Sequence, residues 1–306
     1  AQEKKVKSNQ LDAKVDYWNI INKKSDINLT FGTIYSKQEF DSDIFQFLTG
    51  SNDDIYNPTP LINNGLDYND VSYSFNDVYL GLHYRLKIGK FTISPGFTAH
   101  SYSSENSQNE AFDVGFVNYK KSFFKLLPDF NMIIQLKDSE TLRLNYAMRT
   151  QFTDVSKIAR GLVLNNYNSI FIGTQDLQNA ISHNISLNYY SFNLFNYTNV
   201  YAGINYNKSI DQIRNLTSFE SVIATSNPFN SSFADENLSI FGRYQRSYGK
   251  IRGTLGANLN LSKFNQFIRD TSAPSLNETF SQSYNGSLRT LFKNAPNIEA
   301  GMNYSI

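Results

Sequence analysis

Aromatic side chains are the residues of this sequence best suited to recognise a ligand. The chain holds 20 Tyr and 24 Phe but one Trp. Their rings can stack on a sugar or an aromatic ligand, and the tyrosine hydroxyl adds a hydrogen bond. Seven of them are candidate ligand contacts, four in long connections and three on polar strand faces: Tyr56, Tyr68, Tyr167 and Phe171, and Trp18, Tyr79 and Tyr201. The alternative for the last three is contact with one another or with another part of the protein.

Other chemistry finds little support in the sequence. There is no cysteine, and His83, His100 and His183 lie far apart without the HExxH spacing of a zinc site. Acidic segments at 51–54 and 66–70 offer oxygen ligands for Ca²⁺, but they lack an EF-hand pattern and are typical of solvated loops. No nucleophile-elbow or phosphate-loop motif occurs. We therefore expect no enzyme activity, no metal and no cofactor.

The balance of positive and negative charges argues against one class of partner, nucleic acid. Lys and Arg total 28 and Asp and Glu total 27, which gives a net charge of +1. A nucleic-acid-binding domain would need a clear basic excess, so no nucleic acid is expected.

The segment 141–150, TLRLNYAMRT, shows which elements position the candidate residues. Its apolar and polar residues alternate with a period of two, which is the pattern of a β-strand with unlike faces. The same alternation recurs along the chain and predicts about twelve strands. They lie near 4–20, 25–41, 71–88, 90–104, 113–136, 140–152, 180–192, 197–213, 233–247, 250–264, 280–292 and 297–306.

The connections between these strands alternate in length. Tight turns such as 87–90 (KIGK) and 137–140 (KDSE) are followed by long loops such as 42–70 and 153–179. Outer-membrane barrels have short turns at the periplasmic end and long loops outside, and their strands are long. The sequence therefore predicts an all-β fold, an antiparallel up-and-down transmembrane β-barrel. A soluble sandwich or β-helix is the alternative.

The cost of burying charge in lipid assigns the two faces. An Arg or Lys on the lipid face at mid-bilayer costs about 2–4 kcal/mol. A register slip of one residue in 141–150 would place Arg143 and Arg149 there. The face of Leu142, Leu144 and Met148 should therefore contact lipid, and the arginine face should line a wet lumen.

Three segments resemble the barrel of TonB-dependent receptors of the Bacteroidetes type. The first, 127–152, reads LPDFNMIIQLKDSETLRLNYAMRTQF and is similar to a family strand, charged turn and strand in series. The second, 173–190, reads GTQDLQNAISHNISLNYY and matches the family's "GNPNLKPE…HN.ELSY" segment at Gly173, Asp176, Leu177, His183 and their neighbours. The family's prolines are replaced by Gln175 and Asn179. The third, 10–36, resembles a paired family hairpin.

This resemblance implies a barrel of about twenty-two strands with a plug domain and a TonB-contact motif. The sequence predicts about twelve strands and no plug or TonB-contact segment in residues 1–306. Unpaired strand edges are not tolerated in lipid. We therefore expect residues 1–306 to be part of a larger barrel, and a closed barrel of twelve strands is the alternative.

The resemblance further implies import of an external nutrient, a siderophore, a glycan or a peptide, across the outer membrane. The implied partners are membrane lipid, a plug and TonB, and in some cases a surface lipoprotein. A plug would also be a contact for Trp18, Tyr79 and Tyr201. Two other functions stay open: a scaffold subunit of an outer-membrane assembly or secretion complex, and a soluble β-rich adhesin.

Overall fold

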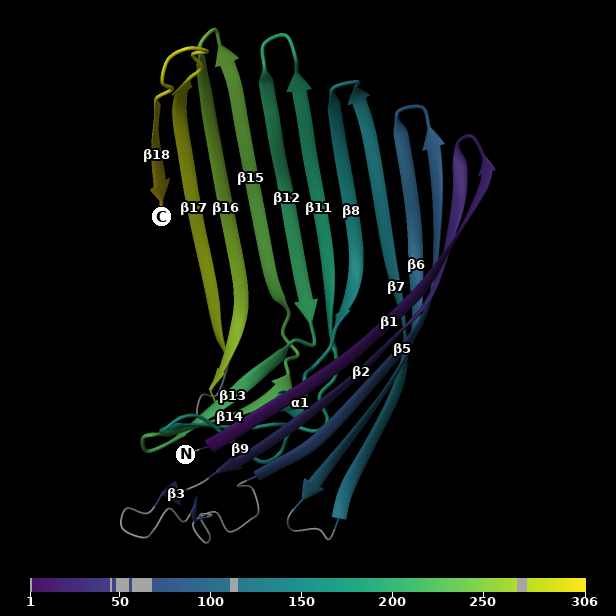
Figure 1. Cartoon of the computed structure of the whole chain (residues 1–306), viewed down its shortest axis with the longest axis vertical. Helices are drawn as coiled ribbons and strands as arrows, with labels where there is room; N and C mark the ends of the chain where they lie inside the picture. Colours follow the sequence, from purple (N-terminus) through teal and green to yellow (C-terminus); the bar gives the residue numbers. More distant parts are fainter. Residues whose placement is uncertain (1, 45, 48–54, 57–67, 111–114, 269–273) are drawn as a thin grey trace.

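The computed structural model of the chain describes residues 2–44, 46–47, 55–56, 68–110, 115–268 and 274–306. All twelve expected strands are present, and they form one curved antiparallel sheet in chain order (Figure 1). They are β1 (Gln2–Asn22), β2 (Ser25–Ile44), β5 (Tyr68–Ile88), β6 (Phe91–Glu110), β7 (Gly115–Lys137), β8 (Glu140–Gln151), β11 (Ala180–Asn193), β12 (Thr198–Ile210), β15 (Asp235–Tyr248), β16 (Ile251–Ile268), β17 (Ser275–Thr290) and β18 (Glu299–Ser305).

The two ends of the sheet differ as the sequence predicts. Tight turns join the hairpins at the upper end of Figure 1, and the described elements of the long connections lie at the lower end. Gly89 and Gly249 occupy two of the turns with φ of 57° and 60°. This left-handed region suits glycine, which has no Cβ to clash there.

Short elements in the long connections were not predicted. They are β3 (Gln46–Phe47), β4 (Ile55–Tyr56), α1 (Val155–Ile158), β9 (Leu162–Asn166), β10 (Ser169–Ile172), β13 (Ile213–Glu220) and β14 (Ile223–Asn230). Four of them extend the main sheet from the end of β16 in the order β13, β14, β10, β9. The β13–β16 and β14–β10 pairs are parallel, so the expectation of a purely antiparallel sheet is wrong at this end. We call these four strands, together with α1 and the other residues of the connection 153–179, the strap.

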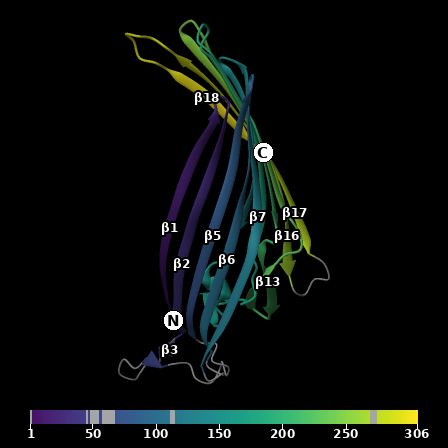
Figure 2. The ribbon, with the colours of Figure 1, turned by 90° about the vertical axis from the view of Figure 1, so that its right-hand side faces the viewer.

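The strap lies inside the curve of the sheet (Figure 2). The face that contacts the strap is therefore the inner face of the sheet. The strand register then shows which other residues share that face. Arg143 pairs with Asn188, and Asn145 pairs with Asn131 and Ser186 on that inner face. Leu144 pairs with Met132 and Leu187 on the opposite, outer face.

Hydrogen-bonded polar side chains line the inner face. Asn145 Nδ2 donates to Ser186 Oγ at 3.1 Å, and Asn207 Nδ2 donates to Asn184 Oδ1 at 2.6 Å. His100 Nδ1 lies 2.9 Å from a carboxylate oxygen of buried Asp77. An interior of this composition is suited to water and to polar solutes.

The outer face carries an apolar band bounded by charge. Leu11, Val15 and Tyr17 are more than half exposed on this face. Toward the long-loop end the band gives way to ion pairs between neighbouring strands, which we call the charged row. Its N–O distances are 3.6 Å for Lys7–Glu39, 3.1 Å for Lys120–Glu105, 3.1 Å for Lys208–Glu236 and 2.6 Å for Lys263–Glu278.

The described chain leaves the two outermost strands with one neighbour each. β1 pairs with β2, β18 pairs with β17, and the sheet is not closed in the described residues. None of the helices in the described ranges has the length and apolar character needed to cross a membrane.

Candidate functional site

The strap packs on the inner wall through an apolar cluster. Val155 and Ile158 of α1 are each 2% exposed. The wall contributes Phe40, Val71, Tyr73, Phe75 and Tyr102, and the strap also contributes Ala159, Val163 and Leu177. Burial of several apolar side chains fixes the loop 153–179 against β2, β5 and β6.

The short helix α1 is shaped by its own first residues. Asp154 precedes the helix in an extended conformation, and its side chain accepts a hydrogen bond from Lys157 N at 3.2 Å. Aspartate is a favoured residue at this capping position. Val155 and Ile158 are three residues apart, so both lie on the face that meets the wall.

Amide side chains of the wall bind the backbone of the strap. Gln38 Oε1 accepts from Val155 N at 3.0 Å, and Asn69 Oδ1 accepts from Gly161 N at 2.7 Å. Gln108 Nε2 donates to the carbonyl of Ile158 at 2.8 Å, and Gln108 Oε1 accepts from Arg160 N at 3.2 Å. The backbone groups of this irregular loop have no partner strand. The amide side chains of the wall supply the hydrogen bonds that a neighbouring strand would otherwise supply.

The far edge of the strap is bound to β1. Gln2 donates to the carbonyl of Leu162 at 3.1 Å and accepts from Leu164 N at 2.8 Å. Lys4 Nζ donates to the carbonyl of Leu164 at 2.6 Å. The strap thus crosses the long-loop end of the sheet, which we call the mouth, from β16 at one side to β1 at the other (Figure 1).

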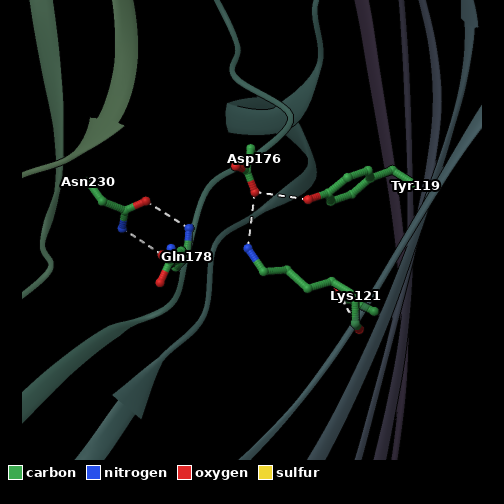
Figure 3. A network of polar contacts seen from close by, with 6 residues as sticks. Tyr119, Lys121, Asp176, Gln178 and Asn230 are labelled. Atoms are coloured by element: carbon green, nitrogen blue, oxygen red, sulfur yellow. Dashed lines mark hydrogen bonds and ion pairs between the residues drawn. The ribbon is translucent and has the colours of Figure 1, made fainter.

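Asp176 connects its segment to β7 of the wall, and Gln178 connects it to β14 of the strap (Figure 3). Asp176 Oδ1 accepts from Tyr119 Oη at 3.0 Å and from Lys121 Nζ at 3.1 Å. On the other side, Asn230 exchanges two hydrogen bonds with the Gln178 backbone, at 2.7 and 2.8 Å. The hydrogen bond and charge of Lys121, together with the Tyr119 hydroxyl, lower the pKa of Asp176 below its ordinary value of 3.8.

A cavity of about 160 Å³ lies between this segment and the wall. Its lining combines aromatic rings, amides and cations, and includes Tyr73, Asn106, Lys121, Phe123, Thr153 and Gln175. A chamber of this size and polarity suits one small polar group of a ligand.

The three aromatic residues predicted for the lumen all lie on the inner face. Trp18 pairs with Asn28 at the N-terminal edge and is 62% exposed. Tyr79 stacks on His100 with ring centroids 5.4 Å apart, and Tyr201 approaches Phe241 at 5.2 Å. Their ligand-binding role stays a prediction.

The four aromatic residues predicted for the loops are scattered. Tyr167 is 96% exposed at the β9–β10 turn, whereas Phe171 packs against the apolar cluster of the strap. Tyr68 begins β5 on the outer face, opposite Asp43, and the Tyr56 side chain lies outside the described part of the chain. No ring contact found in the described residues joins two of the seven candidates.

Sequence reasoning missed the residues that hold the strap. The sequence pattern puts Asn69, Gln108 and Asn230 in long connections, outside the expected strands. Period-two alternation carries no information on their strap partners, which lie 50 to 92 residues away. Asp176 and Gly173 were found through the family resemblance alone. Within the described ranges, no group of three His, Asp or Glu side chains is placed to hold a metal ion.

Comparison with known proteins identifies the family. The chain belongs to the outer membrane protein beta-barrel family, whose profile matches residues 1–306. It is therefore a multi-pass protein of the outer membrane. No curated protein sequence matches the chain.

Solved receptor structures share the fold. The FrpB iron transporter from Neisseria meningitidis (F5-1 variant) matches with a TM-score of 0.64 and 13% identity, over 99% of this chain and 43% of that one. The copper transporter OprC matches at 0.59 and 10% identity, over 99% and 48%. The Serratia marcescens hemophore receptor HasR, solved with its hemophore HasA and heme, matches at 0.56 and 9% identity, over 100% and 60%. The chain spans about half the length of these proteins.

Proposed function

We propose that this chain, as a member of the outer membrane β-barrel family, forms the wall and mouth of a receptor that imports an external nutrient. The observation that carries the proposal is the strap, which covers a polar lumen and encloses a cavity beside the Asp176 contacts. A pore for unselective diffusion needs no such built cover. The similar structures named above are receptors or transporters for iron, copper and a heme carrier, and they support import as the activity.

The complete receptor is a larger barrel of about twenty-two strands in this proposal. The single-sided pairing of β1 and β18 supports it, since an unpaired strand edge is costly in lipid. A plug and TonB would supply gating and energy, as the resemblance to Bacteroidetes-type receptors implies. The nutrient is a siderophore, a glycan or a peptide, and a surface lipoprotein would assist the capture of a large one.

Growth of a gene-deletion strain tests import. The strain is grown under iron limitation, under copper limitation and on single glycans or peptides as nutrient, and we expect a defect in one of these conditions. Complementation with full-length protein lacking residues 156–176 should leave the defect in place, because most of α1, both β9 and β10, and the Asp176 contacts are lost. Heat-modifiable mobility must first show that the variant barrel is assembled.

The control shortens the 292–297 turn at the opposite end, which should restore growth. Full growth with the strap deletion would contradict the role of the mouth. A scaffold subunit, in contrast, would give loss of its partner proteins from the membrane under all conditions.

A further inference from the structure

An open groove of about 590 Å³ crosses the lipid-facing side of the sheet near its tight-turn end. Three neighbouring strands place short side chains side by side there, because Ala202 pairs with Gly242 and Gly242 pairs with Ala257. A Cβ on Gly242 would meet no atom within 4 Å. These short side chains therefore form the floor of the groove.

The sides of the groove are apolar and aromatic. Tyr244 and Leu255 pair with each other on the tight-turn side of the floor, and Tyr284 pairs with Ala257 beside it. The outer-face lining also includes Val200, Gly286, Met302 and Tyr304. A surface of this composition is suited to a hydrocarbon chain.

One cation lies beside the groove. Arg246 follows Tyr244 on the same face of β15 and pairs with Gly253 of β16. Its guanidinium carbon lies 4.7 Å from the centre of the Tyr248 ring. Among the described residues between the charged row and the tight turns, Arg246 is the single charged side chain on the outer faces of β12, β15, β16, β17 and β18. No carboxylate of these faces is therefore placed to neutralise it, and an uncompensated charge on a lipid-facing surface is costly.

The strand length places Arg246 at the second boundary of the apolar band. It follows Glu236 of the charged row by ten residues on the same strand, about 33 Å at 3.3 Å per residue. A tilt of about 35–45° reduces this to a height of about 25 Å, the height of the apolar band of outer-membrane barrels. Because the charged row lies on the long-loop side, Arg246 lies at the level of the headgroups of the periplasmic leaflet. The groove begins two residues deeper, at Tyr244, at the level of the acyl chains.

We propose that Arg246 and the groove bind one phospholipid molecule of the periplasmic leaflet, with its phosphate on Arg246 and an acyl chain on the floor at Gly242. Every phospholipid carries this anion, and arginine binds phosphate through paired N–H donors. Contact with bulk lipid is common to the whole outer face, whereas this site combines a cation with a groove on its hydrocarbon side. The site does not depend on what the protein imports.

Native mass spectrometry of the purified, delipidated full-length protein tests the site. The probes are dioleoylphosphatidylglycerol and dioleoylphosphatidylethanolamine, which carry the phosphate, and dioleoylglycerol, which lacks it. We expect the first equivalent of either phospholipid to bind more tightly than later equivalents. Dioleoylglycerol should show no preferred first equivalent.

Two variants separate the charge from the groove. Arg246→Gln should weaken the first binding step about tenfold, as expected for one lost hydrogen bond between charged groups. Gly242→Leu fills the floor and should remove the preferred first step. Its added side chain is apolar and faces lipid, so the barrel should keep the heat-modifiable mobility of the wild type.

The matched controls make the same changes outside the site. Arg289→Gln removes an arginine of the inner face at the same end of the sheet, where Arg289 pairs with Arg252. Ala99→Leu adds a leucine to the outer face of β6, where Ala99 pairs with Leu80 and Leu126. Both controls should bind phospholipid as the wild type does.

Equal first binding constants for the wild type, Arg246→Gln and Gly242→Leu, all with wild-type heat-modifiable mobility, would overturn the proposal and show that lipid acts here as bulk solvent. First-step binding of dioleoylglycerol as tight as that of the phospholipids would also overturn it, because the phosphate would then not be recognised. Neither result would affect the growth test of import.

Discussion

At the scale of single residues, Arg143 and Leu144 show how one strand position fixes a face. The two are neighbours in β8, yet Arg143 pairs with Asn188 on the wet side and Leu144 pairs with Leu187 toward lipid. The same substitution type therefore has unequal consequences at the two positions.

Leu144→Arg should impair assembly far more than Arg143→Leu. An arginine at mid-bilayer costs about 2–4 kcal/mol, whereas a leucine in the lumen loses little. The amount of heat-modifiable barrel in outer-membrane fractions measures the difference. Equal losses for the two variants would show that the faces are wrongly assigned.

Asp176 gives the mouth a dependence on pH. Its pKa is lower in the docked strap than its ordinary value of 3.8, because Lys121 and Tyr119 favour the carboxylate. The contact therefore contributes fully above the ordinary pKa and is lost as the pH falls through the lowered one. Because the side chain of Asp176 is 71% exposed, the contribution is small and screened by salt.

A label beside Asp176 should report this loss. The chain has no cysteine, so Thr174→Cys accepts a single environment-sensitive fluorophore. We expect the emission to change as the pH falls below 3.8, and Asp176→Asn to show most of that change already at pH 7. Asp138→Asn, at the opposite end of the sheet, should behave as the wild type. A full pH response in Asp176→Asn would assign the transition to another group.

At the scale of elements, the strap depends on close backbone approach. A Cβ on Gly173 would lie 2.2 Å from the Ala159 carbonyl oxygen and 2.7 Å from the Lys157 carbonyl oxygen. Backbone atoms cannot yield as a flexible side chain does. The glycine that matches a family motif therefore has a physical role, the close contact between the end of α1 and the irregular segment after β10.

Gly173→Ala should destabilise the docked strap by about 1–3 kcal/mol, the usual cost of overpacking. Faster trypsin cleavage after Lys157 measures the loosened loop. Gly242→Ala is the control, since a Cβ there meets no atom within 4 Å. Equal protection of Lys157 in the wild type and Gly173→Ala would show that the strap tolerates the methyl group.

Elements also show what the sequence could and could not predict. Alternation located the twelve long strands because each strand has lipid on one face and water on the other. Its side chains must therefore alternate in polarity along its whole length. The strap was missed because short segments such as β9 and α1 have no period of their own. They are held by Gln2, Asn69 and Gln108, which lie outside the expected strands 4–20, 71–88 and 90–104, and the pattern predicts none of their partners.

At the scale of the whole molecule, the height of the apolar band on the outer face can be compared with the thickness of the membrane. The stretch from Leu11, on the tight-turn side of the charged row, to Ile21 beside the tight turn is about 33 Å long at 3.3 Å per residue. A tilt of 35–45° reduces this to a height of about 25 Å, the thickness of the apolar band of outer-membrane barrels. The charged row therefore lies at the boundary on the long-loop side.

The open sheet leads to a prediction for the isolated segment. Residues 1–306 expressed alone should fail to give a heat-modifiable barrel, because β1 and β18 would leave unpaired backbone groups in lipid. The full-length gene product should give one under the same conditions. A stable, heat-modifiable monomer from the segment alone would favour the alternative of a closed twelve-stranded barrel.

The strap has a consequence for the order of assembly. Its anchors come from β1, β2, β5, β6 and β7, and the Gln2–Leu162 contact joins residues 160 apart in the chain. Such distant contacts are gained only after the chain entropy of the intervening loops has been lost. We therefore expect the hairpins to pair in register before the strap can form its hydrogen bonds to them, so the mouth forms last. A newly inserted molecule passes through a stage with an uncovered lumen, and completion of the strap marks the mature protein.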